Sequence, residues 1–213
     1  MAFAGLDVGT SGAKLLVYDL DGAILFTASR KYEELGSGGR RELNPETVMK
    51  NVKEVLREAG ENCPEKIEAM AVTSLGESVV CLDKEGRVLA NSMLTGDPRG
   101  IEEIKEIIET MGDQKIFEIT GLPPNELYGL PKYMWLNRNT DAVKRAEAIL
   151  FYEDFVGYML TGQRKVSYSS AARSMAFDIR KMEWSKELLK LAGIRAEQMS
   201  EPVKPCTVIG AIL

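Results

Sequence analysis

Apolar residues in the first part of the chain gather in three short segments that are separated by turns. The segments are Ala4–Val8, Lys14–Asp19 and Ala23–Tyr32, and each has the length and β-branched content typical of a strand. The dipeptide Asp21-Gly22 between the last two favours a two-residue hairpin turn. The pattern therefore predicts three consecutive antiparallel strands.

The hydrophobic period changes from two to about four after a glycine-rich loop over Glu33–Arg41. Asn44 followed by Pro45 is typical of a helix N-cap and first helical residue, and the pattern predicts a helix that ends near Gly60. A fourth strand is expected over Ile67–Thr73. In the helix predicted after Asn44, the apolar residues that share one face and would pack against a core are Val48, Val52, Val55 and Leu56.

The rest of the chain is expected to be mainly helical, with one further hairpin and one buried strand. The hairpin would join Ser78–Leu82 to Val88–Leu94 through a turn at Asp83–Gly86. Ala148–Tyr152 is expected to be the strand, and an extended tail follows with two prolines. The expected helices are Ile101–Met111, Lys115–Ile119, Leu130–Asn137, Asp154–Leu160 and Ser185–Ala192.

Composition narrows the class of protein. The chain has 213 residues, of which 45% are apolar and 28% charged, and these values are ordinary for a globular domain. A net charge of −5 argues against nucleic acid and anionic membranes as partners. No apolar run approaches the length of a membrane span, and no basic segment of a signal peptide precedes the first strand. Three scattered cysteines fit a reducing compartment, so a cytoplasmic location is expected.

The chain contains no histidine, which excludes several kinds of chemistry. No serine–histidine or cysteine–histidine nucleophile, histidine base or histidine-bound metal can form. Carboxylates, lysine, arginine, hydroxyls and a bound metal remain. These groups suit phosphoryl transfer, in which positioning and charge stabilisation supply most of the catalysis.

The first turn carries the strongest candidate chemistry. Backbone N–H groups of a glycine-containing turn, together with hydroxyls and a lysine, can bind phosphate oxygens. The preceding acid, Asp7, could hold Mg²⁺ directly or through water, and the turn residues concerned are Gly9, Thr10, Ser11, Gly12 and Lys14. The alternative is a structural hairpin with a solvated lysine. The spacing is neither a P-loop nor a dinucleotide fingerprint, because a strand follows the turn.

This turn resembles the hairpin phosphate loop of the superfamily that includes actin and hexokinase. The order of three strands, a helix, a strand and helical insertions is similar to the ribonuclease H-like core of that superfamily. The resemblance implies an α/β fold: a mixed sheet with three antiparallel first strands, flanking helices and helical insertions. Residues 1–213 would form a single domain.

Later segments resemble one branch of that superfamily, the FGGY family of carbohydrate kinases. The resemblance covers almost the whole chain and keeps the order of the family motifs. The matching segments are Ser74–Asp83, Leu94–Arg99, Thr120–Leu136, Tyr152–Gly162, Ser167–Trp184 and Pro202–Gly210. The details are most like xylulokinases, and the resemblance implies the N-terminal, sugar-binding domain of an ATP-dependent sugar kinase that acts on a pentulose or a related sugar.

The resemblance assigns roles to two groups of residues. ATP and Mg²⁺ would contact Asp7, Gly9, Thr10, Ser11, Gly12 and Lys14, with Asp7 toward the metal. The sugar or polyol would contact Glu77, whose carboxylate accepts hydrogen bonds from hydroxyls. Gly76 stands where glycerol kinases have arginine, which would favour a longer substrate that needs the space. Tyr128 is a weaker candidate, because Leu127 takes the place of the family tyrosine.

Asp97 and Arg99 match an aspartate–arginine pair of the family and leave two interpretations open. They could contact the substrate or support its pocket. They could equally form an ion pair at the start of the following helix, with Asp97 as its N-cap. The tryptophan that precedes the pair in the family is replaced here by Thr95.

The resemblance also implies what the sequence does not contain. The family uses an aspartate base in a Gly-Gly-Asp segment just after the linker between its two domains, which would lie beyond Leu213, and the C-terminal ATP-binding domain would be absent from these residues. We therefore expect no catalytic residue in these 213 residues, an inactive isolated domain, and exposed apolar surface that could promote a homodimer. Alternative functions are a gluconokinase, a glycerol-kinase-like enzyme, and a non-kinase ATPase or pseudokinase binding module.

Overall fold

The centre of the molecule is a four-stranded mixed sheet. The computed structural model describes all residues from 1 to 213. Strands β1 (Ala2–Val8), β2 (Gly12–Tyr18) and β3 (Ile24–Lys31) form an antiparallel meander, and β5 (Ile67–Ser74) runs parallel to β1 on its other side. The order β3-β2-β1-β5 confirms the predicted α/β fold with three antiparallel first strands.

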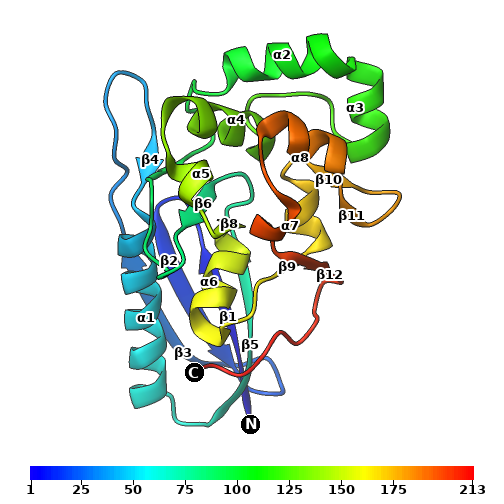
Figure 1. Cartoon of the computed structure of the whole chain (residues 1–213). Coiled ribbons are helices and arrows are strands. Elements are labelled where there is room, and N and C mark those ends of the chain that lie inside the picture. The colour runs from blue at the N-terminus through cyan, green and yellow to red at the C-terminus, as the bar shows by residue number, and fades with distance from the viewer.

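Helix α1 (Pro45–Asn62) makes the crossover that allows β5 to lie parallel to β1. The Asn44 side chain caps it by accepting hydrogen bonds from the N–H groups of Glu46 and Thr47, at 2.8 and 3.2 Å. Helix α1 lies along β2 and β3, and α6 (Tyr152–Thr161) packs against β5 (Figure 1). The core between these elements contains Leu6, Val8, Val48, Val52, Val55 and Phe155.

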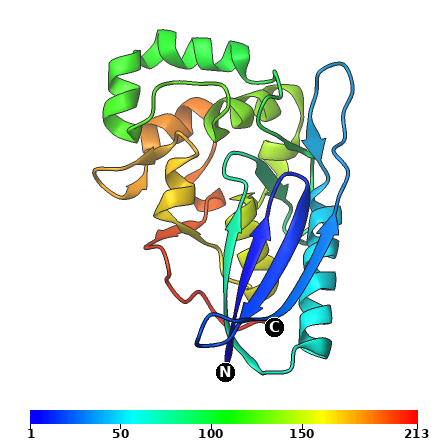
Figure 2. The same ribbon diagram turned by 180° about the vertical axis from the view of Figure 1, so that it is seen from behind.

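No helix covers the opposite face of this sheet. Figure 2 views the molecule from that side and shows the strands in front of α1 and α6. Strand side chains alternate between faces, so the neighbours of buried Leu6 and Val8 point away from α1. Asp7 on β1, Lys14 on β2 and Thr73 on β5 are all exposed.

A second hydrophobic cluster lies beyond the end of the sheet that carries the β1–β2 turn, and it is mainly helical. The tail then returns along α6, where the Leu213 N–H donates to the Leu160 carbonyl at 2.9 Å. None of the helices combines the length with the apolar character that a membrane crossing requires. The remaining elements are β4 (Glu42–Leu43), β6 (Val79–Leu82), β7 (Ser92–Met93), α2 (Ile101–Met111), α3 (Asp113–Thr120), α4 (Gly129–Asn139), α5 (Ala142–Arg145), β8 (Ala148–Phe151), β9 (Lys165–Ser167), α7 (Tyr168–Ala172), β10 (Phe177–Asp178), β11 (Glu183–Trp184), α8 (Lys186–Ala192), a 3-10 turn η1 (Ala196–Gln198) and β12 (Glu201–Val203).

The predicted hairpin between Ser78–Leu82 and Val88–Leu94 is much shorter than expected. Only one bridge, between Leu82 and Val88, extends the turn, while β6 pairs with β8 and β7 pairs with β4. Side-chain hydroxyls join the two segments instead. Ser92 Oγ donates to the Val79 carbonyl and Ser78 Oγ to the Met93 carbonyl, both at 2.7 Å. Side chains therefore join β6 to β7, while the backbone of each strand pairs with another strand.

Asp154 in the first turn of α6 is a fully buried carboxylate. It accepts hydrogen bonds from the Phe151 N–H at 2.7 Å and from Ser200 Oγ at 2.6 Å. Burial penalises the charged form more than these two bonds favour it, and raises the pKa of Asp154 to about 7. The carboxyl group of an unfolded chain has a pKa of about 4.

We expect Asp154→Asn to remove a pH dependence of stability. Between about pH 4 and 7 the folded chain holds a proton on Asp154 that the unfolded chain has lost. The free energy of unfolding should therefore fall by up to about 1.4 kcal/mol per pH unit as the pH rises through this range. Urea unfolding from pH 4 to 8 should show this slope in the difference between wild type and Asp154→Asn.

The matched control is Asp21→Asn, which removes an exposed carboxylate in a turn. Its stability should run parallel to that of the wild type over the same pH range. Parallel curves for Asp154→Asn as well would show that Asp154 titrates normally in the folded chain.

Candidate functional site

The predicted phosphate-binding residues lie together at one end of the helix-free sheet face. Asp7 on β1 is directly opposite Lys14 on β2 in the antiparallel pair, and opposite Thr73 on β5 in the parallel pair. The chain turns immediately after Asp7, through residues 9–12, which we call the phosphate turn. A carboxylate, an ammonium group and the turn therefore share one exposed edge of the sheet.

The phosphate turn presents hydrogen-bond donors that the chain itself does not use. The Gly9 N–H closes the turn by donating to the Gly12 carbonyl at 3.0 Å. The N–H groups and hydroxyls of Thr10 and Ser11 have no acceptor within the chain, and Lys14 makes no ion pair. Converging free donors beside a lysine can bind the oxygens of a phosphate group.

Gly12 is required for a reason other than contact with an anion. A Cβ atom at this position would lie 2.7 Å from the carbonyl oxygen of Arg30 on β3, so a side chain would force β2 and β3 apart. Neither Gly9 nor Gly12 has a positive φ. The glycine therefore maintains the spacing of the strands that carry the phosphate turn.

Tyr32, which directly follows β3, forms hydrogen bonds to the backbone of the phosphate turn and was not predicted as a site residue. Its hydroxyl donates a hydrogen bond to the Gly9 carbonyl, and its N–H donates to the Ser11 carbonyl at 3.2 Å. Burial, and to a lesser extent the Asp7 carboxylate, raise the pKa of Tyr32, so the hydroxyl remains a donor. In the sequence, only its place at the end of a strand could have indicated this role.

The donor set fits a magnesium–phosphate group better than a metal bound by protein alone. No cluster of three or more acidic or thiol side chains is present that could hold a metal. Asp7 is a single carboxylate with no hydrogen-bond donor from the chain. Mg²⁺ in nucleotide sites commonly takes one or two carboxylates and completes its shell with water and phosphate oxygens. Asp7 and the free donors of the turn match that requirement.

The predicted sugar contact Glu77 lies beside the phosphate turn. Residues 75–78, which we call the glutamate loop, follow β5, and the Leu75 N–H donates to the Val8 carbonyl at 3.0 Å. The Glu77 side chain is 14% exposed and forms an ion pair with Arg173. Thr95 Oγ1 is 3.4 Å from Glu77 Oε2. The parallel pairing of β1 with β5 thus brings the two predicted contact sets together.

Gly76 and Tyr128 both contact the side chain of Arg173, which was not predicted as a site residue. A Cβ atom at Gly76 would lie 3.5 Å from Arg173 Cγ, an ordinary contact distance, so this side chain borders the space that the glycine was expected to leave for a substrate. The guanidinium carbon lies 5.2 Å from the centroid of the largely buried Tyr128 ring. In the sequence, Arg173 was marked only by its place between Ser169 and Trp184, in a segment that resembles the family.

Asp97 and Arg99 form part of a buried ion-pair network. Asp97 accepts four hydrogen bonds: from the backbone N–H and two guanidinium nitrogens of Arg99, and from the Arg41 N–H. Arg99 also pairs with Glu42 at 2.7 Å and packs over the Trp135 ring. The Asp97 side chain has no exposed surface. These contacts favour the ion-pair interpretation over direct contact with a substrate.

The predicted N-cap role of Asp97 is wrong. Helix α2 begins at Ile101, and the residue at its N-cap is Gly100, with φ of 103° and no side-chain cap. Asp97 instead accepts hydrogen bonds from Arg41 and Arg99, and these bonds hold the segment that precedes the helix.

Lys132 on α4 supports the glutamate loop from the interior. Its side chain is fully buried, and Nζ donates to the Glu77 carbonyl at 3.2 Å. Burial lowers the pKa of Lys132 to about 8, an effect that Asp97 opposes. Lys132 lay within a family-like segment of the sequence, but nothing there assigned it to the site.

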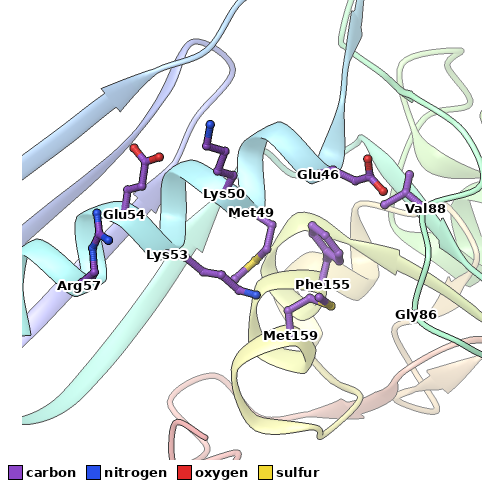
Figure 3. A pocket seen from close by; sticks show the side chains of 10 residues that line it. All are labelled: Glu46, Met49, Lys50, Lys53, Glu54, Arg57, Gly86, Val88, Phe155 and Met159. Atoms are coloured by element: carbon purple, nitrogen blue, oxygen red, sulfur yellow. The ribbon is translucent and has the colours of Figure 1, made fainter.

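A depression of about 520 Å³ lies elsewhere, between α1 and α6 (Figure 3). Its lining combines the apolar side chains of Met49, Phe155 and Met159 with charged side chains of α1, including Lys53. Helix α1 covers the sheet face opposite to Asp7. The depression is therefore separate from the phosphate turn and the glutamate loop.

The sheet order and its flanking helices define a domain with the actin and hexokinase type of fold, and the candidate phosphate turn lies at one edge of its sheet. The family model described as FGGY family of carbohydrate kinases, N-terminal domain, matches residues 2–213, and the chain belongs to this family. A glycerol kinase of Thermococcus gammatolerans is 31% identical over 89% of the chain, and a xylulose kinase of Bacillus subtilis is 28% identical over 98%. The chain covers 40% and 43% of these relatives, so it spans less than half of their length.

Solved structures confirm the fold over the whole chain. A xylulose kinase from Rhodospirillum rubrum superposes with a TM-score of 0.94 at 24% identity, covering 100% of this chain and 45% of that one. A kinase from Brucella ovis, described as a xyloylose kinase, gives 0.91 at 28% identity, again over 100% and 45%. A gluconate kinase from Lactobacillus acidophilus gives 0.92 at 24% identity over 100% and 44%.

We expect Asp97→Asn to destabilise the fold strongly. The change removes one charge of a buried pair and leaves the Arg99 guanidinium with Glu42 as its only anionic partner. Breaking such a pair typically costs about 3 kcal/mol or more in the free energy of unfolding. Chemical denaturation of the two proteins measures this difference.

Glu34→Gln is the control, because Glu34 pairs with Arg41 at the surface. An exposed pair contributes about 1 kcal/mol or less. Equal effects of the two substitutions would show that the Asp97–Arg99 pair has no structural role beyond that of a surface ion pair.

Proposed function

We propose that this chain is the sugar-binding part of an ATP-dependent kinase that phosphorylates a hydroxyl of a pentulose or a related sugar. The observation that carries the proposal is the junction of β1 with β5. A turn with free donors for phosphate and a carboxylate that can accept hydrogen bonds from hydroxyls leave the sheet at the same edge, joined by the Leu75–Val8 hydrogen bond. Donor and acceptor of a phosphoryl group would meet there.

In this proposal the phosphate turn holds the nucleotide end. Thr10 and Ser11 would donate to phosphate oxygens, Lys14 would balance their charge, and Asp7 would hold Mg²⁺ directly or through water. ATP supplies the γ-phosphoryl group when bound. Tyr32 would keep the turn in position through its bond to the Gly9 carbonyl.

Glu77 would orient the sugar, and the proton of the attacking hydroxyl needs a base. Asp97 is fully paired, and Asp7 would face the phosphates, so neither suits this role. We propose that the chain is the N-terminal part of a full-length kinase, below called the longer protein, and that the base is an aspartate of its C-terminal half, as in the family. The isolated chain should then bind ligands without turnover, and closure of two domains would exclude water during transfer.

The experiment that tests this function measures ADP release by the longer protein with xylulose, ribulose, gluconate and glycerol. We expect turnover with a neutral ketose or polyol. Preferred turnover of gluconate would indicate the gluconokinase alternative, and preferred turnover of glycerol would favour a glycerol-kinase-like enzyme. ATP hydrolysis that no sugar stimulates would favour a non-kinase ATPase, and no activity at all would favour a pseudokinase.

We expect Asp7→Ala to reduce turnover of the longer protein by about 100-fold or more while the KM for sugar changes little. Charge stabilisation of this kind contributes mainly in the transition state. The measurement is steady-state kinetics with ATP and sugar varied separately. Asp21→Ala, an exposed aspartate in the next turn, is the matched control and should behave as wild type. Unchanged turnover of Asp7→Ala would refute the metal role.

A further inference from the structure

Arg173, which follows α7, is held on three sides at the edge of the glutamate loop. Its guanidinium forms an ion pair with Glu77, and its carbon lies 5.2 Å from the Tyr128 ring centroid. The aliphatic part of the side chain passes over Gly76, where an added Cβ would lie 3.5 Å from Cγ and 3.7 Å from Nε. Two segments that are distant from Arg173 in sequence, the glutamate loop and Tyr128, therefore hold one guanidinium.

The guanidinium keeps donors that the chain does not use. Only Nη2 makes a hydrogen bond, to Glu77, while the hydrogens on Nε and Nη1 have no acceptor within the chain. The Arg173 side chain is 42% exposed, so these donors can be reached from outside. A carboxylate and a guanidinium side by side offer acceptors next to donors.

We propose that Arg173 binds the substrate directly, and that the Glu77–Arg173 pair selects an uncharged substrate with adjacent hydroxyls, a polyol or a ketose, over a sugar acid. This inference rests on the proposed function of the site. One hydroxyl donates to the Glu77 carboxylate, and its neighbour accepts from Arg173, which suits a group that is both donor and acceptor.

The charge of the pair excludes a sugar acid as the preferred substrate. The negative charge of Glu77 already balances the positive charge of Arg173. A substrate carboxylate would have to displace Glu77 from the guanidinium and remain next to a like charge, which is unfavourable in a partly enclosed site. An uncharged diol can bind both groups without separating them.

The test compares Arg173→Gln with Arg180→Gln in the longer protein. Arg180 is an exposed arginine of the same segment without an ion pair, so its variant should behave as wild type. Loss of hydrogen bonds from a charged donor should raise the KM for the preferred neutral sugar by about 10- to 100-fold. The KM for ATP should not change. Identical kinetics of the two variants would overturn the role of Arg173.

A second variant tests the selection by charge. Glu77→Gln leaves the Arg173 charge without its partner, so the ratio of kcat/KM for gluconate to that for ribitol or xylulose should rise by about tenfold or more. An unchanged or lower ratio would overturn the selection by charge. Preference of the wild-type protein for gluconate over every neutral sugar would overturn it as well.

Calorimetric titration of the present chain separates this inference from the kinase function. Binding of xylulose or ribitol that Arg173→Gln weakens and Arg180→Gln does not would support the inference even where the longer protein transfers no phosphoryl group. Absence of binding of every neutral sugar by the wild-type chain, and by the longer protein with ATP, would overturn the inference. Matching melting curves show that the variants are folded.

Discussion

The parallel pairing of β1 with β5 is the constraint on which the site depends. Parallel neighbours end at the same edge of a sheet, so the phosphate turn after Val8 and the glutamate loop after Ser74 leave the sheet side by side. Such pairing requires a crossover, which α1 supplies, and burial of its apolar face against β2 and β3 stabilises the arrangement. One backbone pairing therefore brings together two halves of the site that are far apart in the sequence.

The two halves of the site differ in how their charges are balanced. Around the phosphate turn, Asp7 and Lys14 have no ion-pair partners, so both charges remain free for an ionic ligand. At the glutamate loop, Glu77 is paired with Arg173, and Asp97 with Arg99 behind it. Unpaired charges attract a magnesium phosphate, whereas paired charges favour hydroxyls that can bond to both members of the pair. In the proposed function, this contrast would allow two unlike ligands to bind next to each other.

Local patterns predicted most elements, because periodicity, the Asn44–Pro45 cap and the Asp21–Gly22 turn act over a few residues. The prediction of a long hairpin between Ser78–Leu82 and Val88–Leu94 was wrong. The hydroxyls of Ser78 and Ser92 join the two segments in place of backbone hydrogen bonds, and a strand pattern does not predict such side-chain bonds. Among the candidate site residues, the turn from Asp7 to Lys14 could be picked out from its spacing, although its phosphate role stays a prediction. Tyr32, Lys132 and Arg173 could not, because each acts through a partner distant in sequence: Glu77 and Arg173 are 96 residues apart.

The two glycines of the candidate site show that a sequence motif can have more than one physical cause. At Gly12 the phosphate motif suggested room for an anion, but the close neighbour is the Arg30 carbonyl of β3. At Gly76 the motif suggested room for a longer substrate, and the Arg173 side chain borders that space at ordinary contact distance. At Gly12 the missing side chain allows β3 to approach, whereas at Gly76 it leaves a space with Arg173 at its border. A side chain at Gly12 would therefore change the site indirectly, by moving β3, whereas a Cβ atom at Gly76 would only contact Arg173.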